Sequence, residues 1–125
     1  MTTRIVVSAM SDQGLEAPVS PHFGRCPYFT VIDVEDEQVS AVKTVANPFY
    51  AQHQPGQVPG FIHSLGANVM LSGGMGGRAV AFFQQYGIEP ATGACGTVGE
   101  SISQYLNGGL SGAAACAESV EHGHG

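Results

Sequence analysis

ANVMLSGGMGGR, residues 67–78, is the stretch that decides the fold of this chain. Its first half, residues 67–72, is a short apolar run of the kind that predicts a buried β-strand. A glycine-rich turn, residues 73–77, follows at once. Arg78 then opens a segment with apolar residues at helical spacing, which Gly87 ends. A strand, a glycine turn and a helix in this order predict a strand–helix crossover unit.

The same alternation continues on both sides of this stretch. Apolar residues at helical spacing mark a helix over residues 58–65. IEPAT, residues 88–92, predicts a short strand, and Pro90 within it favours the edge of the sheet. Thr97 and Glu100 have the T-x-x-E spacing of a capping box and predict the start of a third helix. Strands that alternate with helices are typical of parallel pairing with crossovers.

The first half of the chain predicts antiparallel pairing instead. RIVVSA, Arg4–Ala9, is a β-branched run expected to form a buried strand. Two alternating segments, Tyr28–Val34 and Gln38–Val45, flank EDE and predict a hairpin. We therefore predict an α/β domain with a mixed sheet over residues 1–109, followed by a flexible Ala- and Gly-rich tail over residues 110–125.

Composition excludes several classes of partner. The chain has 125 residues, a formal net charge of −6 and only four Lys and Arg residues. It lacks the basic stripe that nucleic acid or an anionic membrane requires. No apolar run is long enough to cross a bilayer or to act as a signal peptide. Three cysteines without a C-x-x-C motif disfavour a disulfide framework. We expect a monomeric, cytoplasmic protein.

Unusual residues gather in three loops that follow the presumed parallel strands. Ligands bind outside the carboxyl ends of such strands, so loops 10–27, 73–77 and 93–96 are expected to form one pocket. Helix N-termini near Gly76 and Thr97 favour an anion there. Imidazole and sulfur favour a transition metal. The pocket is therefore predicted to hold an anionic ligand that contains metal or sulfur. The residues that support this prediction are His22, Arg25, Cys26, Met75, Arg78 and Cys95.

Three motifs resemble those of the dinitrogenase iron–molybdenum cofactor biosynthesis domain family. They are SPHFGRCPYF (residues 20–29), LSGGMGGRA (residues 71–79) and GACGTVGESISQYLNG (residues 93–108). The family includes nitrogenase cofactor carriers and accessory proteins, and the orange protein of sulfate-reducing bacteria, which holds a molybdenum–copper sulfide cluster non-covalently. The resemblance extends from about Arg4 to Gly109.

This resemblance implies a ribonuclease-H-like three-layer fold with a mixed five-stranded sheet, an antiparallel hairpin and three helices. It also implies carriage of a molybdenum-containing metal–sulfur cofactor, with iron or copper, rather than catalysis. A protein that makes or receives the cofactor is the implied partner. The histidine of the family's H-F-G motif corresponds to His22, and its glycine turn to Gly73, Gly74, Gly76 and Gly77. With these we predict Arg25, Met75, Arg78 and Cys95 as cofactor-binding residues, and His22, Cys26 and Cys95 as metal ligands.

Each of these residues also has a purely structural interpretation. His22 could hold a loop carbonyl, and Cys26, just before a strand, is more often a small buried hydrophobe. Cys95, at a helix entry, is the better candidate for an accessible thiolate. GGMGGR lacks the G-K-[ST] of a phosphate-binding loop, so a tight turn explains it equally well. Arg78 could pair with a surface carboxylate.

Two further functions compete with cofactor carriage. A nuclease needs carboxylates on the first strand to hold magnesium. RIVVSA has none, and Asp12 is the only acid close after it, so we reject that function. An oxyanion- or nucleotide-sensing module that uses the same loops without metal remains the alternative. His122 and His124, in the tail, are interpreted as solvated residues, and Cys116 as incidental.

Overall fold

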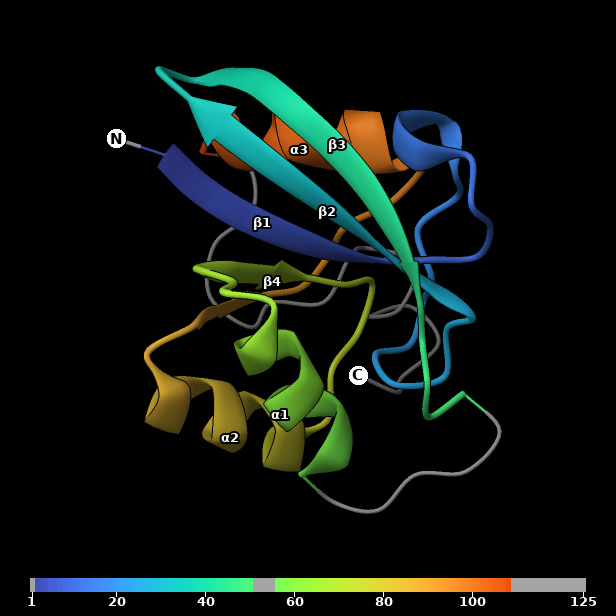
Figure 1. The fold of residues 1–125 in the computed structure, drawn as a ribbon, viewed down its shortest axis with the longest axis vertical. Coiled ribbons are helices and arrows are strands. Elements are labelled where there is room, and N and C mark those ends of the chain that lie inside the picture. Colours follow the sequence, from blue (N-terminus) through green and yellow to red (C-terminus); the bar gives the residue numbers. More distant parts are fainter. Residues whose placement is uncertain (1, 51–55, 109–125) are drawn as a thin grey trace.

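The computed structural model describes residues 2–50 and 56–108, which form one mixed α/β layer structure (Figure 1). Five strands lie in the order β3-β2-β1-β4-β5, and three helices flank them. The mixed five-stranded sheet and the three helices confirm the predicted fold class. The elements are β1 (Thr2–Ala9), η1 (Gly14–Glu16, a 3-10 turn), β2 (Tyr28–Glu35), β3 (Gln38–Ala46), α1 (Gln57–Ser64), β4 (Val69–Leu71), α2 (Gly77–Tyr86), β5 (Glu89–Ala91) and α3 (Val98–Leu106).

The sheet combines a long antiparallel hairpin with three parallel strands. β1 pairs antiparallel with β2, and β2 with β3, as the alternating segments predict. β1 also pairs parallel with β4, and β4 with β5. The strands that follow β1 in the chain are therefore added first on one side of it, β2 and β3, and then on the other, β4 and β5. Pro90 lies in the edge strand β5, as expected. In sheets of this type the point where the strand order reverses is the usual place for a ligand.

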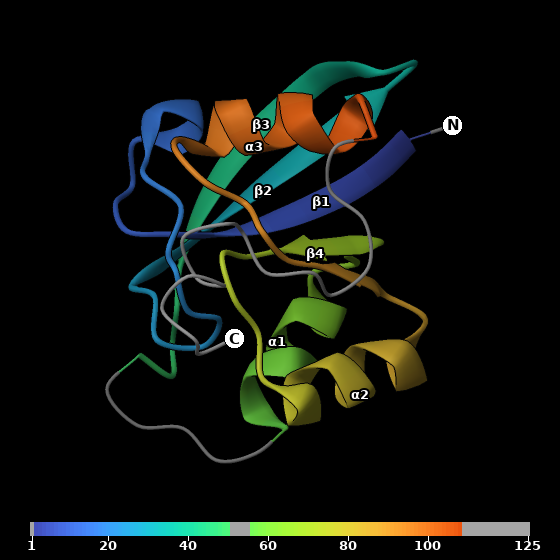
Figure 2. The same ribbon diagram turned by 180° about the vertical axis from the view of Figure 1, so that it is seen from behind.

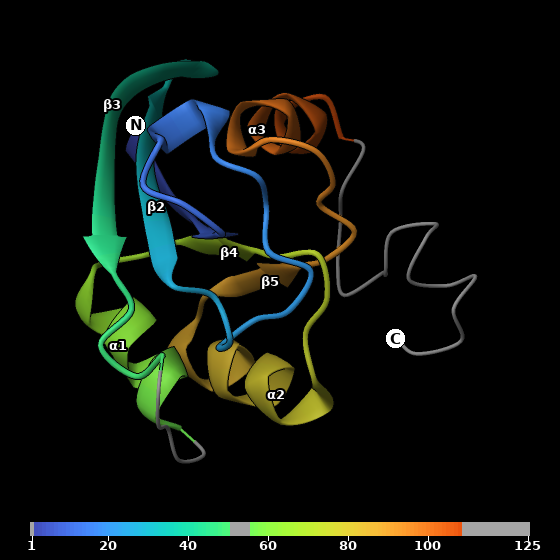
Figure 3. The same cartoon turned by 90° about the vertical axis from the view of Figure 1, so that its right-hand side faces the viewer.

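Helices cover both faces of the sheet, and the two layers bury separate apolar clusters. α1 and α2 lie on one face, while α3 and η1 lie on the other (Figures 2 and 3). Val6, Met70 and Phe83 belong to the cluster under α1 and α2. Val7 and Leu71, the next residues along β1 and β4, belong to the cluster under α3. This alternation follows from the two-residue period of a strand.

Two details differ from the sequence prediction. The predicted apolar face of α2 is only partly buried, because Phe83 alone in that helix is fully covered. Tyr86, predicted to belong to that face, is 38 % exposed, and its ring stacks on His63 of α1 with centroids 4.4 Å apart. η1 is an unpredicted turn in the first loop. The predicted tail, with His122, lies outside the described residues.

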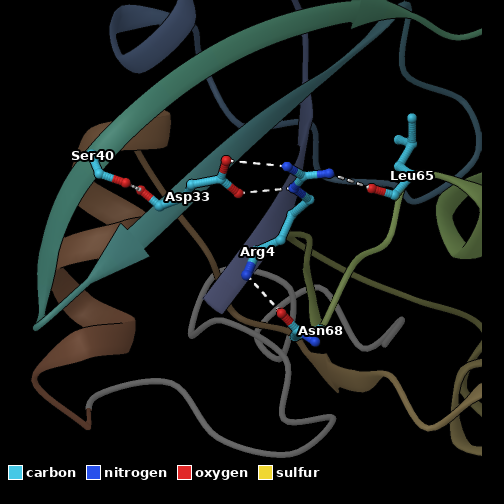
Figure 4. Close-up of polar contacts among 5 residues, drawn as sticks. All are labelled: Arg4, Asp33, Ser40, Leu65 and Asn68. Carbon is cyan, nitrogen blue, oxygen red and sulfur yellow. Dashed lines mark hydrogen bonds and ion pairs between the residues drawn. The ribbon is translucent and has the colours of Figure 1, made fainter. Parts of the chain in front are cut away.

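A polar clamp holds the amino end of β1 (Figure 4). The Arg4 guanidinium donates to both carboxylate oxygens of Asp33 on β2, at 2.8 and 3.1 Å. It also donates to the Leu65 carbonyl after α1 at 2.8 Å, and the Arg4 N–H donates to Asn68 before β4 at 2.8 Å. The clamp therefore joins β2, β1 and the α1–β4 connection at the end opposite the three loops.

None of the described helices is long and apolar enough to span a bilayer.

Candidate functional site

Backbone hydrogen bonds join the three loops at the carboxyl ends of β1, β4 and β5. The Gly73 N–H donates to the Ser20 carbonyl at 3.1 Å, and the Gly93 N–H donates to the Gly73 carbonyl at 3.1 Å. The Val19 N–H donates to the Gly96 carbonyl at 2.9 Å. The predicted convergence of these loops at one end of the sheet is confirmed.

Residues 18–20 lie beside the carboxyl end of β1 and add a short antiparallel pairing there. Val19 forms an antiparallel bridge with Ala9, and the Ser20 N–H donates to the Ser8 carbonyl at 2.8 Å. The chain itself therefore occupies the position next to the carboxyl end of β1 in the plane of the sheet.

The segment after Ser20 packs directly on the first two glycines of the turn. A Cβ atom on Gly73 would lie 2.7 Å from Pro21 Cα, and one on Gly74 would lie 3.0 Å from the Pro21 carbonyl oxygen. The Phe23 N–H donates to the Gly74 carbonyl at 3.1 Å. Only glycine allows so close a backbone approach, so Gly73 and Gly74 serve the packing of the loops.

The rest of the turn faces open space. A Cβ atom on Gly76 or Gly77 would meet no heavy atom within 4 Å. Both glycines are exposed, as is Arg78 in the next position. His22 and Arg25, in the neighbouring loop, are exposed too. These five predicted site residues are therefore accessible at the same end of the sheet.

Both site arginines lack a carboxylate partner among the described residues. The salt bridge that the structure records in residues 2–50 and 56–108 joins Arg4 to Asp33, at the opposite end of the sheet. The structural alternative for Arg78, pairing with a surface carboxylate, is not observed in these ranges. Arg25 and Arg78 thus bring uncompensated positive charge to one region of an acidic chain.

Cys26 is fully buried, which confirms the interpretation that it packs as a small hydrophobe. It belongs to the cluster under α1 and α2. Burial raises the pKa of the Cys26 thiol, and this effect outweighs the opposing influence of the Ser8 hydroxyl and nearby backbone groups. The neutral thiol is the favoured form, whereas metal ligation requires a thiolate. The geometry therefore makes Cys26 the weakest of the predicted metal ligands.

Cys95 and Met75 occupy intermediate positions. Cys95 is half-buried, and its Sγ donates to the Gly93 carbonyl at 3.3 Å, a contact that a thiol makes and a thiolate cannot. Met75 is partly buried and packs against the cluster under α1 and α2. Both lie within the converging loops, as expected, and their roles toward a ligand remain predictions.

The two helix N-termini at this end of the sheet differ. Thr97 and Glu100 form the predicted capping box at α3: the Thr97 N–H donates to the Glu100 carboxylate at 2.9 Å, and the Glu100 N–H donates to the Thr97 hydroxyl at 3.1 Å. The Val98 N–H donates to the Ala17 carbonyl at 2.8 Å. These N–H groups of α3 are therefore occupied by the chain itself, and a carboxylate already lies there.

The α2 N-terminus has no side-chain cap. Its N-cap residue is Gly76, in an extended conformation, and no side-chain hydrogen bond caps the first turn. First-turn N–H groups of a helix have no partner within the helix and attract anions. With Arg78 in this turn and no acidic residue beside it, α2 is the N-terminus that suits an anionic ligand.

Two residues that hold the first loop in place, Asn47 and Ser20, are not among the predicted site residues. The Asn47 amide donates to the Cys26 carbonyl at 2.8 Å and to the Gly24 carbonyl at 3.4 Å. The Ser20 hydroxyl donates to the His22 carbonyl at 2.8 Å. Asn47 follows β3, remote in sequence from the loop it holds, so no local pattern indicates its role. The short Ser-Pro-His spacing is a signal that could have identified Ser20 as a turn-forming residue.

The donor set suits an anion better than a bare cation. In the described ranges, no three His, Cys, Asp or Glu side chains come together as a metal site. The accessible groups are instead the α2 N–H groups, two guanidinium groups and the His22 imidazole. Such groups suit an anionic ligand that is held by charge and by charge-assisted hydrogen bonds.

Three known proteins resemble this chain, two in their solved structures and one in sequence. The apo orange protein from Desulfovibrio gigas is 29 % identical, with a TM-score of 0.80 over 90 % of this chain and 94 % of that one. Protein PH0822 is 37 % identical, with a TM-score of 0.77 over 86 % of this chain and 94 % of that one. Protein MJ0580 from Methanocaldococcus jannaschii is 28 % identical over 94 residues, which are 74 % of this chain and 80 % of that protein.

The family comparison covers most of the chain. The sequence profile described as dinitrogenase iron–molybdenum cofactor matches residues 4–108, which include most of β1, all three converging loops and α3. The match agrees with the resemblance inferred from the three motifs. The chain therefore belongs to the dinitrogenase iron–molybdenum cofactor family.

Proposed function

We propose that this protein is a non-catalytic carrier or scaffold for an anionic metal–sulfur cofactor that contains molybdenum with iron or copper. The cofactor is its cargo, held non-covalently at the carboxyl ends of β1, β4 and β5. The observation that carries the proposal is the uncapped N-terminus of α2, with exposed Gly76 and Gly77 and with Arg78 in its first turn. Family membership supports the choice of cargo.

The charges of the site explain how such a cargo is held. Metal–sulfide clusters are anionic and polarizable, and charge-assisted hydrogen bonds are the strong ones. Arg25 and Arg78 supply charge without a carboxylate partner in the described ranges, and the α2 dipole adds to it. His22 adds one hydrogen bond or one bond to metal. A protein that makes or receives the cofactor is the proposed partner.

Reconstitution tests this function directly. The purified chain is mixed anaerobically with tetrathiomolybdate, with and without copper or iron, and separated from unbound metal by gel filtration. We expect visible absorbance and molybdenum to co-elute with the protein. Absence of bound metal in every mixture would overturn the proposal. Equal binding of molybdate or of a nucleotide without sulfide would instead favour the sensing module.

Two matched variants localise the cargo. Arg78→Ala removes an unpaired charge at α2, and loss of one charge-assisted hydrogen bond is expected to weaken tetrathiomolybdate binding about ten- to hundredfold. Lys43→Ala removes an exposed charge from the middle of β3, away from the loops, and should leave binding unchanged. Equal effects of the two substitutions would show that only net charge matters and would contradict the proposed site.

A further inference from the structure

Three buried hydroxyl groups have no hydrogen-bond partner among the described residues. They belong to Ser8, Thr30 and Ser72, each of which is 0 % exposed. A buried hydroxyl without a partner destabilises the folded state, because it gives up its bonds to water and gains none. Such groups are uncommon in native proteins and require an explanation.

Two of the three hydroxyls lie on the same face of the sheet, beside the reversal of strand order. Ser8 pairs with Phe29, whose side chain belongs to the cluster under α1 and α2. Ser72 follows Leu71, which pairs with Val7, so Ser8 and Ser72 each come one residue after the last pair of β1 and β4, where the Ser20 backbone bonds to both Ser8 and Gly73. By strand alternation both point toward the α1 and α2 face.

This position is the inner wall of the candidate site. Ser72 immediately precedes Gly73, the first residue of the turn that leads into α2. Ser8 lies beside the buried Cys26 thiol, close enough to influence it but without hydrogen-bonding geometry. The loop that starts at Pro21 packs on Gly73, the residue after Ser72, and Cys26 of the same loop lies beside Ser8. The two buried hydroxyls therefore adjoin the loop and the glycine turn that lead to the open end of α2.

We propose that the Ser8 and Ser72 hydroxyls donate hydrogen bonds to the anion bound at α2. This inference rests on the proposed function and deepens it, because it names the inner contacts and the ligand class. A hydroxyl rotates to direct its proton toward an acceptor. Two such donors, together with the α2 N–H groups, suit a compact anion with several acceptor atoms, such as a tetrahedral oxo- or thiometallate.

Access to the hydroxyls requires a small movement of the covering loop. Pro21–Phe23 must shift away from Gly73 and Gly74, to which the loop is joined by the Ser20–Gly73 and Phe23–Gly74 backbone hydrogen bonds. The bound anion then occupies the donors that this movement releases. The unpaired hydroxyls would gain partners only in the bound state, so their cost to the unliganded protein becomes a gain on binding.

Thr30 provides a matched control. Its hydroxyl is also buried and unpaired, but it pairs with Val7 and lies on the opposite face of the sheet, under α3. The experiment compares Ser8→Ala, Ser72→Ala, the double variant and Thr30→Val. Anaerobic titration with tetrathiomolybdate, followed by visible absorbance, measures binding, and urea unfolding without ligand measures stability.

The expected pattern is a loss of affinity without a loss of stability. Each serine substitution should raise Kd for tetrathiomolybdate about ten- to hundredfold. All variants, Thr30→Val included, should unfold at the same or a higher urea concentration than the parent chain. Thr30→Val should bind like the parent. Ser72→Thr, which keeps the hydroxyl, should bind more tightly than Ser72→Ala.

The outcomes separate this inference from the proposed function. A parent chain that binds no tetrathiomolybdate contradicts the proposed function and the inference together. A parent chain that binds, with both serine variants binding equally well, overturns the inference alone. Serine variants that lose binding only in proportion to a loss of stability, with Thr30→Val behaving alike, also overturn it, because a structural role then explains the data.

Discussion

The N-termini of α2 and α3 hold equivalent places in the chain and have opposite properties. Each follows a parallel strand and a glycine-containing loop at the same end of the sheet. At α3, Thr97 and Glu100 occupy the first-turn donors and place a negative charge beside them. At α2, Gly76 caps nothing, and Arg78 adds a positive charge. Position in the fold therefore does not make an anion site by itself; the capping residues decide which helix is available.

The difference between the two N-termini also separates residues that stabilise the fold from residues proposed to bind the ligand. The hydrogen bond from the Val98 N–H to the Ala17 carbonyl fastens α3 to the loop after β1, and the capping box closes the first turn of α3 itself. α2 leaves its donors open at a small cost in helix stability, because a glycine N-cap is worse than Ser, Thr, Asp or Asn by only about a few tenths of a kcal/mol. A ligand with negative charge restores that contribution when it binds. Substitutions at α3 should therefore affect folding, and substitutions at α2 should affect binding.

The largest expected effect comes from making α2 resemble α3. In Gly76→Asp the new side chain fits, since the Gly76 backbone is extended and a Cβ atom there meets nothing within 4 Å. The carboxylate should cap α2 and repel the ligand, and we expect tetrathiomolybdate binding to weaken about a hundredfold or more. The urea midpoint without ligand should rise slightly. Normal binding by this variant would show that the α2 N-terminus is not part of the site.

A smaller effect is expected from removing the cap of α3. Thr97→Ala breaks the capping box and should lower the free energy of unfolding by about 1 kcal/mol. Urea denaturation at pH 7 measures this change, with Ser103→Ala, an exposed position in the same helix, as the control. Tetrathiomolybdate binding, measured without urea on the folded variant, should be unchanged. Weaker binding by the folded variant would mean that α3 also contributes donors.

The smallest effect concerns the clamp at the opposite end of the sheet. The hydrogen bond from Arg4 lowers the pKa of Asp33, its positive charge adds to this effect, and partial burial opposes it. A carboxyl with a depressed folded pKa stabilises the protein above its unfolded pKa, about 3.9, and this contribution is lost as the pH falls through the folded pKa. Because the Arg4 side chain is 41 % exposed, we expect Asp33→Asn to cost only about 0.5–1 kcal/mol at pH 7.

Urea unfolding of Asp33→Asn and the parent chain at several pH values checks this prediction. The difference in unfolding free energy should be constant between pH 5 and 7, shrink below about pH 4 and disappear when Asp33 is protonated in both states. Tetrathiomolybdate binding should not change. A pH-independent difference would assign the role of Asp33 to packing instead of charge.

Much of the fold follows from local patterns. The hairpin appears in the alternation of β2 and β3, and the crossovers in the strand–turn–helix order around β4. Pro90 predicts the edge strand, and Thr97 with Glu100 predicts the cap of α3. The T-x-x-E spacing also indicates that the α3 N-terminus is occupied, because a capping box uses the N–H donors that an anion would need. The sequence expectation that both N-termini attract the ligand overlooks this conflict.

Other features have no local signal. Cys26 lies in the same short segment as the exposed His22 and Arg25, but its side chain is fully buried. The Asn47 side chain reaches that segment from the end of β3. The unpaired hydroxyls of Ser8 and Ser72 come to the same end and face of the sheet only when β1 and β4 pair. Each of these facts depends on contacts between residues far apart in the chain.

By itself, the sequence determines the kinds of element, their order, the mixed sheet, and the loops that hold the unusual residues. Hydrophobic period, glycine and proline positions and capping spacing are local properties, and local properties specify local structure. Only the tertiary structure decides which groups in those loops remain available to a ligand. Capping, burial and hydrogen bonds between distant segments remove some donors and expose others. At this end of the sheet they leave α2 and Arg78 open, engage α3, and bury Ser8 and Ser72 without partners.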